Sequence, residues 1–345
     1  MQLKYKYLFN FAASYLGGGY KRLFEYSKWF NENGGAWFII HPHCASLINQ
    51  FQNNRFFLAT QPRYQRIFND CRYLTGIERE IGKPDLYYSY GIPIYARFGK
   101  VNWFHLSNVL PLSTRNIPLP FFDKLKLGYL GWRIKSNYIN ADVISAESSY
   151  SLSLIDSTQA NKLLLSVNGS DDELDFLKNK TVLNKENIAT VIGTYKYKAL
   201  RDSYLVFEML RQNNSQLKLM IIGNKKTIPS DLRNNDNVIA TGLLDRSSVI
   251  DCLQKTMFYI STTHIENSYN AASEGVFFAD ESYISDIGPH RELLLNMPFE
   301  QIVVPGMNRP MLHVSRENIS GENLQTWEDV ISDLINATNI RVHGL

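Results

Sequence analysis

Short apolar runs alternate along this chain with longer segments whose apolar residues recur every three or four positions. Runs such as residues 36–40 and 257–261 have the length and composition of strands buried on both faces. Segments such as residues 199–212 and 245–255 have the spacing of amphipathic helices. This alternation predicts an α/β fold with doubly wound parallel sheets.

The 345 residues are enough for two domains of ordinary size. We expect a Rossmann-like N-terminal domain over residues 1–171, a polar and charged linker over residues 172–186, and a second Rossmann-like domain over residues 187–325. Residues 326–345 are expected to form a C-terminal helix and tail. The acidic run of Asp171, Asp172 and Glu173 is expected to open a helix or linker rather than to bind a metal.

Charge is spread unevenly between the two halves. Residues 1–165 hold 19 Lys and Arg against 10 Asp and Glu, and residues 166–345 hold 17 against 23, so balances of +9 and −6 give the net charge of +3. A basic half indicates an anionic partner, either a nucleic acid or an anionic membrane surface. The chain contains no RNP, KH or zinc-knuckle pattern, which disfavours a nucleic acid.

An aromatic and basic segment at residues 117–139 bears on that choice. Its large apolar side chains interleave with Lys124, Lys126, Arg133 and Lys135. Rings at the level of lipid headgroups and cations on anionic lipid are typical of an interfacial membrane segment. A core helix with a solvated basic face is the other interpretation.

The remaining composition indicates a cytoplasmic protein. The three cysteines are odd in number and far apart, which indicates neither a disulfide framework nor a metal site. Residues 1–6 enter a strand pattern instead of a secretory leader, and no apolar run is long enough to span a membrane. The segment at residues 41–44, HPHC, is too tight for a regular zinc site, so we expect no metal.

Two glycine-containing turns follow expected strands. Gly17, Gly18 and Gly19 lie between a strand over residues 3–11 and an amphipathic helix, where they permit close approach of a ligand or form a flexible turn. They lack the G-x-G-x-x-G spacing of a dinucleotide site. Gly193 follows a strand over residues 187–192 and precedes Thr194 and several cations.

The most informative stretch runs from Glu266 to Glu274. It joins the strand over residues 257–261 to a helix that begins near residue 271. Unpaired backbone N–H groups at such a helix start form a site for a phosphate or diphosphate. One carboxylate before the site and one behind it suit the two sugars that flank a diphosphate. The residues between them that line the site are Asn267, Ser268, Tyr269, Asn270 and Ala271.

The spacing of Glu266 and Glu274 resembles the E-x7-E signature of retaining glycosyltransferases of the GT-B fold, family 4 in particular. Residues 285–292, SDIGPHRE, are similar to a second segment of that family, and residues 168–171 are similar to the N-G-x-D turn that enters its second domain. The resemblance implies two facing Rossmann-like domains with a cleft between them, and a C-terminal helix that packs back across both. It also implies catalysis without a cofactor or a bound metal.

The resemblance assigns roles to the site residues. Glu274 would accept hydrogen bonds from the ribose hydroxyls, and Glu266 would lie at the donor sugar. The first glycine turn would border the donor diphosphate. His105, at the end of an expected strand, would lie near the donor sugar with Asn108 beside it; a buried, hydrogen-bonded histidine is the alternative.

The chain departs from the family at the diphosphate. In the family an Arg after the glycine and a later Lys contact this group. Here Thr194 stands where that Arg is expected, so the cation must come from Lys196, Lys198 or Arg201. We favour Lys198, which with Glu266 and His105 makes the expected catalytic set.

The resemblance implies a retaining glycosyltransferase that uses a nucleotide sugar, UDP-linked in the first place and GDP-linked in the second. The expected acceptor is a glycan, lipid-linked at the inner face of the cytoplasmic membrane. Such a step belongs to the biosynthesis of a surface polysaccharide such as lipopolysaccharide O-antigen or capsule. A GT-B-like sugar-nucleotide epimerase and a non-catalytic nucleic-acid-binding protein stay open as alternative functions. The sequence does not determine the oligomeric state.

Overall fold

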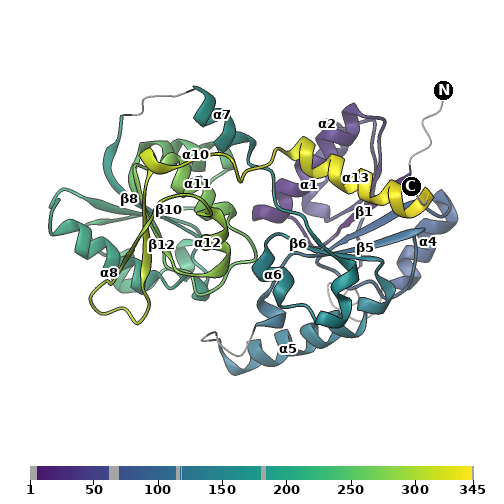
Figure 1. Ribbon diagram of the computed structural model, residues 1–345, viewed down its shortest axis with the longest axis horizontal. Helices are drawn as coiled ribbons and strands as arrows, with labels where there is room; N and C mark the ends of the chain where they lie inside the picture. Colours follow the sequence, from purple (N-terminus) through teal and green to yellow (C-terminus); the bar gives the residue numbers. More distant parts are fainter. Residues whose placement is uncertain (1–5, 62–69, 114–116, 118, 180–183, 344–345) are drawn as a thin grey trace. The chain divides into compact units, whose positions relative to one another are not determined.

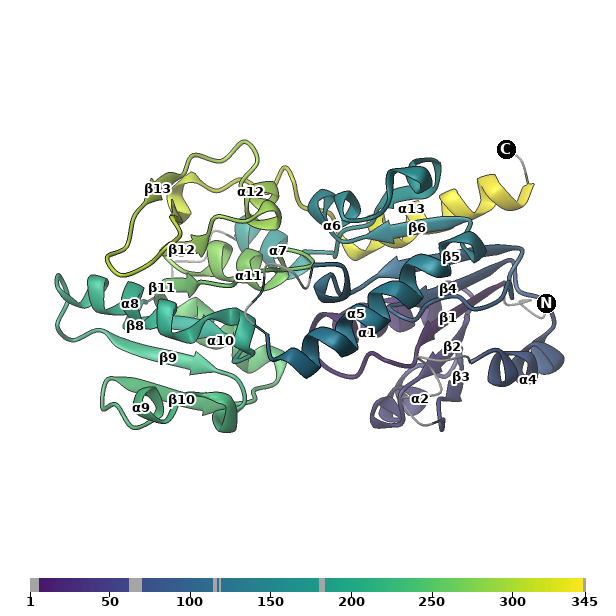
Figure 2. The same cartoon turned by 90° about the horizontal axis from the view of Figure 1, so that it is seen from below.

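The computed structural model describes residues 6–61, 70–113, 117, 119–179 and 184–343 (Figure 1). The chain divides into two compact units. The first comprises Met1–Thr114, Phe121–Gly169 and Gln325–Leu345, and the second comprises Arg115–Pro120 and Ser170–Leu324. Each unit is built around a seven-stranded sheet covered by helices (Figure 2).

The sheet of the first unit runs in the order β3-β2-β1-β4-β5-β6-β7, and all neighbouring strands are parallel. The strand order reverses between β1 and β4, which creates a topological switch point. Strands β2, β4, β5 and β6 are buried along their whole length, as strands covered on both faces of a parallel sheet are. The strands are β1 (Tyr7–Phe11), β2 (Trp37–Ile40), β3 (Arg55–Leu58), β4 (Leu86–Tyr90), β5 (Val101–Leu106), β6 (Val143–Ala146) and β7 (Leu163–Leu165).

Helix α1 begins earlier than the sequence indicated. Gly17, Gly18 and Gly19 form its first turn instead of a loop before it, and Gly17 has a φ of 61°. A residue with a side chain is strained at that angle, so glycine suits this helix start. The helices of the first unit are α1 (Gly17–Glu32), α2 (Ser46–Gln50), α4 (Cys71–Ile81), α5 (Phe121–Ser136), α6 (Ser149–Ser153) and α13 (Trp327–His343).

The sheet of the second unit runs in the order β10-β9-β8-β11-β12-β14-β13. Its first five strands are parallel, and β14 runs antiparallel to both β12 and β13. Here the strand order reverses between β8 and β11. The strands are β8 (Glu186–Ile192), β9 (Lys218–Ile222), β10 (Val238–Gly242), β11 (Thr256–Ser261), β12 (Glu281–Ser285), β13 (Glu300–Ile302) and β14 (Met311–Ser315).

Six helices described in the second unit alternate with these strands. Helix α11 lies so close to β11 that a Cβ atom at Gly275 would overlap the ring of Tyr259. The N-terminus of α10 is capped by Asp245, whose carboxylate accepts a hydrogen bond from the backbone N–H of Ser248 at 2.9 Å. The helices are α7 (Asp171–Asn179), α8 (Leu200–Arg211), α9 (Ser230–Arg233), α10 (Arg246–Lys255), α11 (Asn270–Phe278) and α12 (Gly288–Leu293).

The segment at residues 172–186, expected to be a linker, contains most of helix α7 and the start of β8. The ring of Phe176 in α7 lies 5.1 Å from that of Phe278 in α11, so α7 packs on the second unit. Helix α7 is therefore part of the second unit, and the bounds of a linker stay a prediction. The acidic first turn of α7 suits a helix N-terminus, because negative charge there is favourable.

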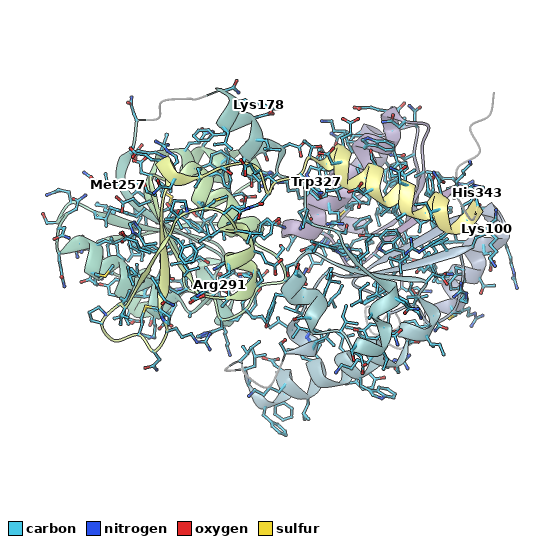
Figure 3. The ribbon with its side chains drawn as sticks, in the orientation of Figure 1. Lys100, Lys178, Met257, Arg291, Trp327 and His343 are labelled. Atoms are coloured by element: carbon cyan, nitrogen blue, oxygen red, sulfur yellow. The ribbon has the colours of Figure 1, made fainter. Side chains whose placement is uncertain are left out.

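The C-terminal helix α13 begins at Trp327, which is labelled in Figure 3. A Cβ atom at Gly169 would lie 2.6 Å from the backbone nitrogen of Trp327. The chain therefore leaves the first unit and returns to it at the same place, before and after the segment 170–324 of the second unit. Two sheets dominated by parallel strands, with alternating helices, confirm the predicted doubly wound α/β fold class. Among the described helices, none is both long and apolar enough to cross a lipid bilayer.

Candidate functional site

The candidate site lies where the strand order of the second sheet reverses. In open α/β sheets, ligands bind outside the carboxyl ends of the strands at such a switch point. Two loops leave the sheet here, residues 193–199 after β8 and residues 262–269 after β11. They contain eight residues of the predicted site, namely Gly193, Thr194, Lys196, Lys198, Glu266, Asn267, Ser268 and Tyr269.

Hydrogen bonds join the two loops. The backbone N–H of His264 donates to the carbonyl of Tyr197 at 2.8 Å. The buried hydroxyl of Thr262 lies 2.9 Å from the carbonyl oxygen of Ala199 and 2.6 Å from the hydroxyl of Ser203 in α8. Ala199 has a positive φ of 47°, which turns the first loop sharply into α8. Together these contacts fix the position of Lys198 relative to the second loop.

Lys198 and Glu266 form an ion pair in this site. The Nζ of Lys198 donates to Oε1 of Glu266 at 2.5 Å, and their side chains are 10% and 20% exposed. Gly193, with a φ of 92°, leaves room for the lysine stem: a Cβ atom there would lie 3.1 Å from Cε of Lys198. A partly buried cation and carboxylate therefore face each other at the switch point.

The other residues predicted around the diphosphate have different surroundings. Thr194 is buried, and its hydroxyl accepts a hydrogen bond from Thr227 at 2.6 Å. Arg201 forms an exposed ion pair with Asp231 at 2.8 Å, and Lys196 is exposed. Of the three candidate cations, the structure brings Lys198 to Glu266.

The loop after Glu266 enters α11 as predicted. Asn267, Ser268 and Tyr269 precede the helix, and Asn270 and Ala271 are its first two residues. Their positions at the carboxyl edge of the sheet give a helix N-terminus next to the ion pair. Such a terminus carries partial positive charge and backbone N–H donors.

Glu274 lies one turn into α11 and is 8% exposed. Its Oε1 accepts a hydrogen bond from Nη1 of Arg246 at 2.5 Å, and Arg246 also forms an ion pair with Asp172 of α7. Burial lowers the pKa of Arg246, but the carboxylates of Glu274 and Asp172 together raise it by more. The pKa of Arg246 is therefore above its usual value, and the side chain is charged. The sequence analysis missed Arg246, because its partners are distant in sequence.

His290 of α12 is a second residue that the sequence analysis missed as a site residue. It is buried, and its Nδ1 donates to the carbonyl of Ser285 at 2.7 Å. Burial lowers the pKa of His290 to about 4, and the charge of Lys198 acts in the same direction, against that of Glu266. His290 is therefore a neutral side chain within the electrostatic influence of the ion pair, and it comes from the SDIGPHRE segment.

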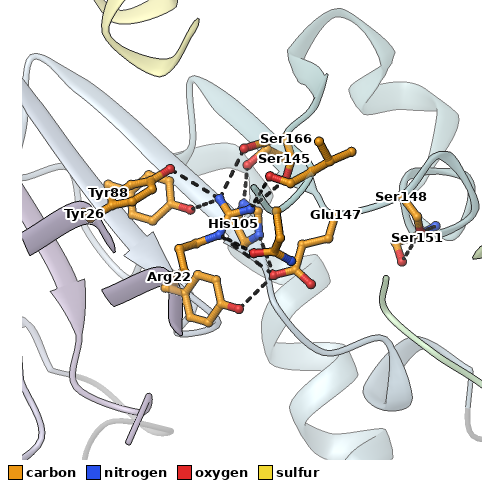
Figure 4. Close-up of polar contacts among 12 residues, drawn as sticks. Arg22, Tyr26, Tyr88, His105, Ser145, Glu147, Ser148, Ser151 and Ser166 are labelled. Atoms are coloured by element: carbon orange, nitrogen blue, oxygen red, sulfur yellow. Dashed lines mark hydrogen bonds and ion pairs between the residues drawn. The ribbon is translucent and has the colours of Figure 1, made fainter. Parts of the chain in front are cut away.

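His105, the third predicted catalytic residue, lies in the first unit and is completely buried (Figure 4). The hydroxyl of Ser145 accepts from the indole N–H of Trp103 at 2.7 Å and lies 2.8 Å from Nδ1 of His105. That hydroxyl can therefore donate to Nδ1, which places the proton of neutral His105 on Nε2, 3.5 Å from Glu147. The environment matches the buried, hydrogen-bonded histidine that the sequence analysis named as the alternative.

Glu147 belongs to the same buried cluster. Its Oε1 accepts a hydrogen bond from the hydroxyl of Tyr90 at 2.8 Å. Burial alone would raise the pKa of Glu147, but Nε2 of His105, 3.5 Å away, and the charge of Arg22 lower it to about 2. Burial, together with the charge of Arg22, lowers the pKa of His105 to about 4.

Arg22 of α1 is fully buried beside this pair (Figure 4). Its Nε donates to Oδ1 of Asn168 at 3.1 Å, and its Nη2 donates to the carbonyls of Ser166 and Val167 at 2.9 and 2.7 Å. The guanidinium also lies 5.5 Å from the ring centroid of Trp327. The sequence analysis did not single out Arg22, which the structure buries completely.

Aromatic side chains gather at the carboxyl edge of the first sheet. The ring of Tyr15 stacks on His41 with centroids 4.5 Å apart, and the ring centroid of His43 lies 4.7 Å from that of His41.

In the part of the chain that the structure describes, no three His, Cys, Asp or Glu side chains gather as ligands for a metal ion.

No family model and no curated protein matches the sequence. Among solved structures, the chain is similar to a sucrose-phosphate synthase from Thermosynechococcus elongatus, with a TM-score of 0.66 at 11% identity over 96% of this chain and 97% of that one. WaaG, a glycosyltransferase involved in lipopolysaccharide biosynthesis, matches with a TM-score of 0.53 at 10% identity over 79% and 78% of the two chains. A UDP-forming α,α-trehalose-phosphate synthase from Burkholderia vietnamiensis matches with a TM-score of 0.52 at 9% identity over 83% and 86%.

At these identities the likeness is one of fold, so activity and membership of family 4 remain predictions. The match to the synthase from Thermosynechococcus elongatus covers nearly all of both chains, which includes both units. The chain therefore has the GT-B fold, with two Rossmann-like units as in these synthases and WaaG.

Proposed function

We propose that this protein is a retaining, metal-independent glycosyltransferase that moves a sugar from a nucleotide sugar, UDP-linked in the first place, to a glycan acceptor. The observation that carries the proposal is the Lys198–Glu266 ion pair at the switch point of the second sheet, beside the N-terminus of α11. The GT-B fold shared with a glycosyltransferase and a UDP-forming synthase supports the same class of donor.

Lys198 and the start of α11 supply positive charge for a donor diphosphate. The ammonium group of Lys198 has three N–H donors, and the bond to Glu266 uses one of them. When the bond from the anomeric carbon to the diphosphate breaks, its electron pair stays on the leaving diphosphate. The lysine and the helix N-terminus stabilise that growing charge in the transition state, which a metal ion would otherwise do.

The two glutamates then serve the two sugars of the donor. Glu274, largely buried in α11, accepts hydrogen bonds from the ribose hydroxyls. Glu266, held by Lys198, lies at the transferred sugar and stabilises positive charge that develops at the anomeric carbon. Both roles use the carboxylates as charged acceptors, and neither requires a covalent intermediate.

Thermal unfolding in the presence of UDP-, GDP- and ADP-sugars tests donor binding. A donor at about 100 times its Kd adds roughly 2.7 kcal/mol to the free energy of unfolding, which gives a clear rise in Tm. With the stabilising donor and a glycan acceptor, NMR of the product reports the anomeric configuration. Retention and full activity after treatment with EDTA are expected; an inverted product or loss of activity with EDTA would contradict the mechanism.

The same reaction separates the transferase from the epimerase. A transferase releases nucleotide in amounts that depend on the acceptor, whereas an epimerase converts the nucleotide sugar into an epimer with no acceptor present. An epimeric nucleotide sugar formed without acceptor would overturn the proposal. So would the lack of any thermal shift with all three nucleotide classes.

Helix α5 of the first unit indicates where the acceptor would be found, because it exposes a stripe of large apolar side chains. Four of them recur at intervals of three or four residues, which places them on one side of the helix. The opposite side is buried at Gly131 and Ile134. The stripe consists of Phe122, Leu125, Tyr129 and Trp132, with Phe121 beside it.

Cations lie on both flanks of this stripe. Around the helix axis, Lys126 and Arg133 fall on one flank, and Lys124 and Lys135 fall on the other. Rings between two rows of cations suit the headgroup region of an anionic membrane. We therefore propose peripheral binding at the cytoplasmic face of the membrane, and a lipid-linked glycan of surface polysaccharide biosynthesis as the acceptor.

Co-sedimentation with vesicles containing phosphatidylglycerol tests this surface at low and high salt. Each Lys or Arg near an anionic surface contributes about 1 kcal/mol, and salt weakens that contribution. Replacing Lys126 and Lys135 with Gln is expected to remove the preference for anionic vesicles. Replacing Phe122 and Trp132 with Ser is expected to weaken binding at every salt concentration, because burial of apolar rings resists salt.

The matched control replaces Lys218 and Lys226, exposed on the second unit, with Gln. It changes the net charge equally and is expected to leave vesicle binding unchanged. Circular dichroism confirms that each variant is folded. If the unmodified protein stays in the supernatant with anionic vesicles at low salt, the membrane surface is refuted and a soluble glycan becomes the acceptor to test.

A further inference from the structure

One guanidinium joins three helices of the second unit. Nη1 of Arg246, the first residue of α10, donates to Oε1 of Glu274 in α11 at 2.5 Å. Its Nε donates to Oδ2 of Asp172 in α7 at 3.1 Å, and its Nη2 donates to the same oxygen. The fork of donors in arginine can serve two carboxylates at once, which a lysine ammonium holds less rigidly.

The position of Arg246 on its own helix is unfavourable. A cation at a helix N-terminus faces the positive end of the helix dipole, which is electrostatically unfavourable. The cap of α10 is already supplied by Asp245, so Arg246 is not needed to start the helix. Its contacts with the two carboxylates therefore explain its presence better than helix stability does.

The N-terminal turn of α7 also contacts Ser273, the residue before Glu274 in α11. The hydroxyl of Ser273 donates to Oε1 of Glu173 at 3.1 Å, and Ser273 and Glu173 are both buried. The first turn of α7 thus contacts α11 directly at Ser273 and through Arg246 at Glu274. Adjacent side chains of α11 are fixed by adjacent acidic residues of α7.

We propose that Arg246, anchored by Asp172, is the positioning residue that holds Glu274 in the orientation needed to bind the ribose hydroxyls of the donor nucleotide. This inference rests on the proposed function. A carboxylate offers about four lone-pair sites on its two oxygens, and Arg246 uses one of them. The remaining sites can accept two hydroxyls, provided that the carboxylate is fixed and ionised.

Calorimetric titration with UDP and 2′-deoxy-UDP gives a readout that a merely structural residue would not change. The deoxy analogue lacks one hydroxyl that Glu274 would bind, so the unmodified protein is expected to bind it about tenfold to a hundredfold more weakly than UDP. Arg246→Met keeps the apolar stem of the side chain and removes the charge. It is expected to bring the ratio of the two Kd values close to one, mainly because the binding of UDP becomes weaker.

Two further variants keep the test decisive. Arg246→Lys retains the charge without the fork and is expected to give an intermediate ratio, as is Asp172→Asn, which leaves Arg246 in place. The matched control is Arg211→Met, which removes an arginine that is 25% exposed and ion-paired with Glu208 in α8, and it is expected to keep the ratio of the unmodified protein.

The outcomes separate the inference from the proposed function. If Glu274→Gln loses the ribose preference while folded Arg246→Met keeps it, Arg246 has no positioning role, and donor binding still stands. Equal binding of UDP and 2′-deoxy-UDP by the unmodified protein also overturns the inference. If neither UDP nor the corresponding GDP and ADP ligands bind, the proposed function itself fails, and the inference fails with it.

Discussion

Glu266 is the residue on which turnover is expected to depend most. Glu266→Gln keeps the shape of the side chain and removes the negative charge that the proposed mechanism places beside the anomeric carbon. Because that charge matters more in the transition state than in the ground state, kcat is expected to fall by about a hundredfold with little change in the donor KM. Steady-state kinetics measures both. A raised KM with unchanged kcat would make Glu266 a binding residue.

The buried His105 is expected to make the stability of the first unit sensitive to acid. In the unfolded chain an ordinary histidine binds a proton near pH 6.5, whereas burial holds the pKa of folded His105 at about 4. The unfolded state therefore binds more protons as the pH falls, so stability is lost from about pH 6.5 towards pH 4. A loss of about 1–3 kcal/mol over this range is expected from His105.

Tryptophan fluorescence measures this loss in one unit, because all 5 tryptophans lie in the first unit. Urea unfolding of the unmodified protein and of His105→Gln, repeated between pH 7 and pH 4.5, gives the slope of stability against pH. The variant is expected to have a shallower slope, whatever its stability at pH 7. Identical slopes would show that His105 does not titrate in this way.

At the scale of elements, the contact of α11 with β11 depends on the absence of a side chain at Gly275. A methyl group there would overlap the ring of Tyr259, a residue of the buried sheet. Gly275→Ala is therefore expected to lower the free energy of unfolding by about 1–3 kcal/mol, as overpacked cores do. Thermal unfolding followed by circular dichroism measures the change.

Gly76→Ala is the matched control for that substitution. Gly76 lies inside α4, and a Cβ atom there would have no neighbour within 4 Å. Alanine is expected to stabilise α4 by roughly 0.5–1 kcal/mol, because it loses less backbone freedom in a helix. If both substitutions raise Tm, the close approach of α11 to β11 is looser than the structure indicates.

The elements themselves were largely predictable. Strands buried in a parallel sheet and helices packed against it leave strong local patterns of apolar residues. The run at residues 257–261 was expected as a strand and forms part of β11. The start of α10 could be placed because Asp245 is a good N-cap. Helix α7 was not placed in this way, because its short polar sequence resembles a linker and its packing comes from Phe278, far along the chain.

The candidate site was predictable to the extent that local motifs carry it. The loop from Glu266 into α11 was placed by the spacing of its residues. Spacing did not decide among the three candidate cations, and the structure brings Lys198 to Glu266. Arg246 and Arg22 were missed because their contacts join residues 28 to 146 positions apart. Burial of an arginine cannot be deduced from its neighbours in sequence, since it depends on acceptors supplied by other elements.

At the scale of the whole molecule, Arg22 holds both segments through which the chain leaves and re-enters the first unit. It bonds the carbonyls of Ser166 and Val167 on the way out and faces the ring of Trp327 on the return. Arg22→Met removes these contacts and leaves Glu147 buried without this cation. A loss of about 3–5 kcal/mol in the stability of the first unit is expected.

Tryptophan fluorescence in urea measures that loss as well. The control is Arg97→Met, which breaks an ion pair with Asp142 at 2.7 Å in which the arginine side chain is 47% exposed. Surface pairs of this kind contribute about 0–1 kcal/mol. Equal effects of the two substitutions would show that the buried network of Arg22 contributes no more than a surface pair.

The contact of Gly169 with Trp327 has a consequence for how such a chain can be assembled. Apart from residues 115–120, the second unit is one continuous insertion, and its two points of attachment meet in the first unit. Insertions are tolerated where the host chain is already closed at the point of entry. Exchange of the gene segment for residues 170–324 for another of the same topology is therefore expected to leave the fold of the host unchanged, and under the proposed function it would change the donor specificity.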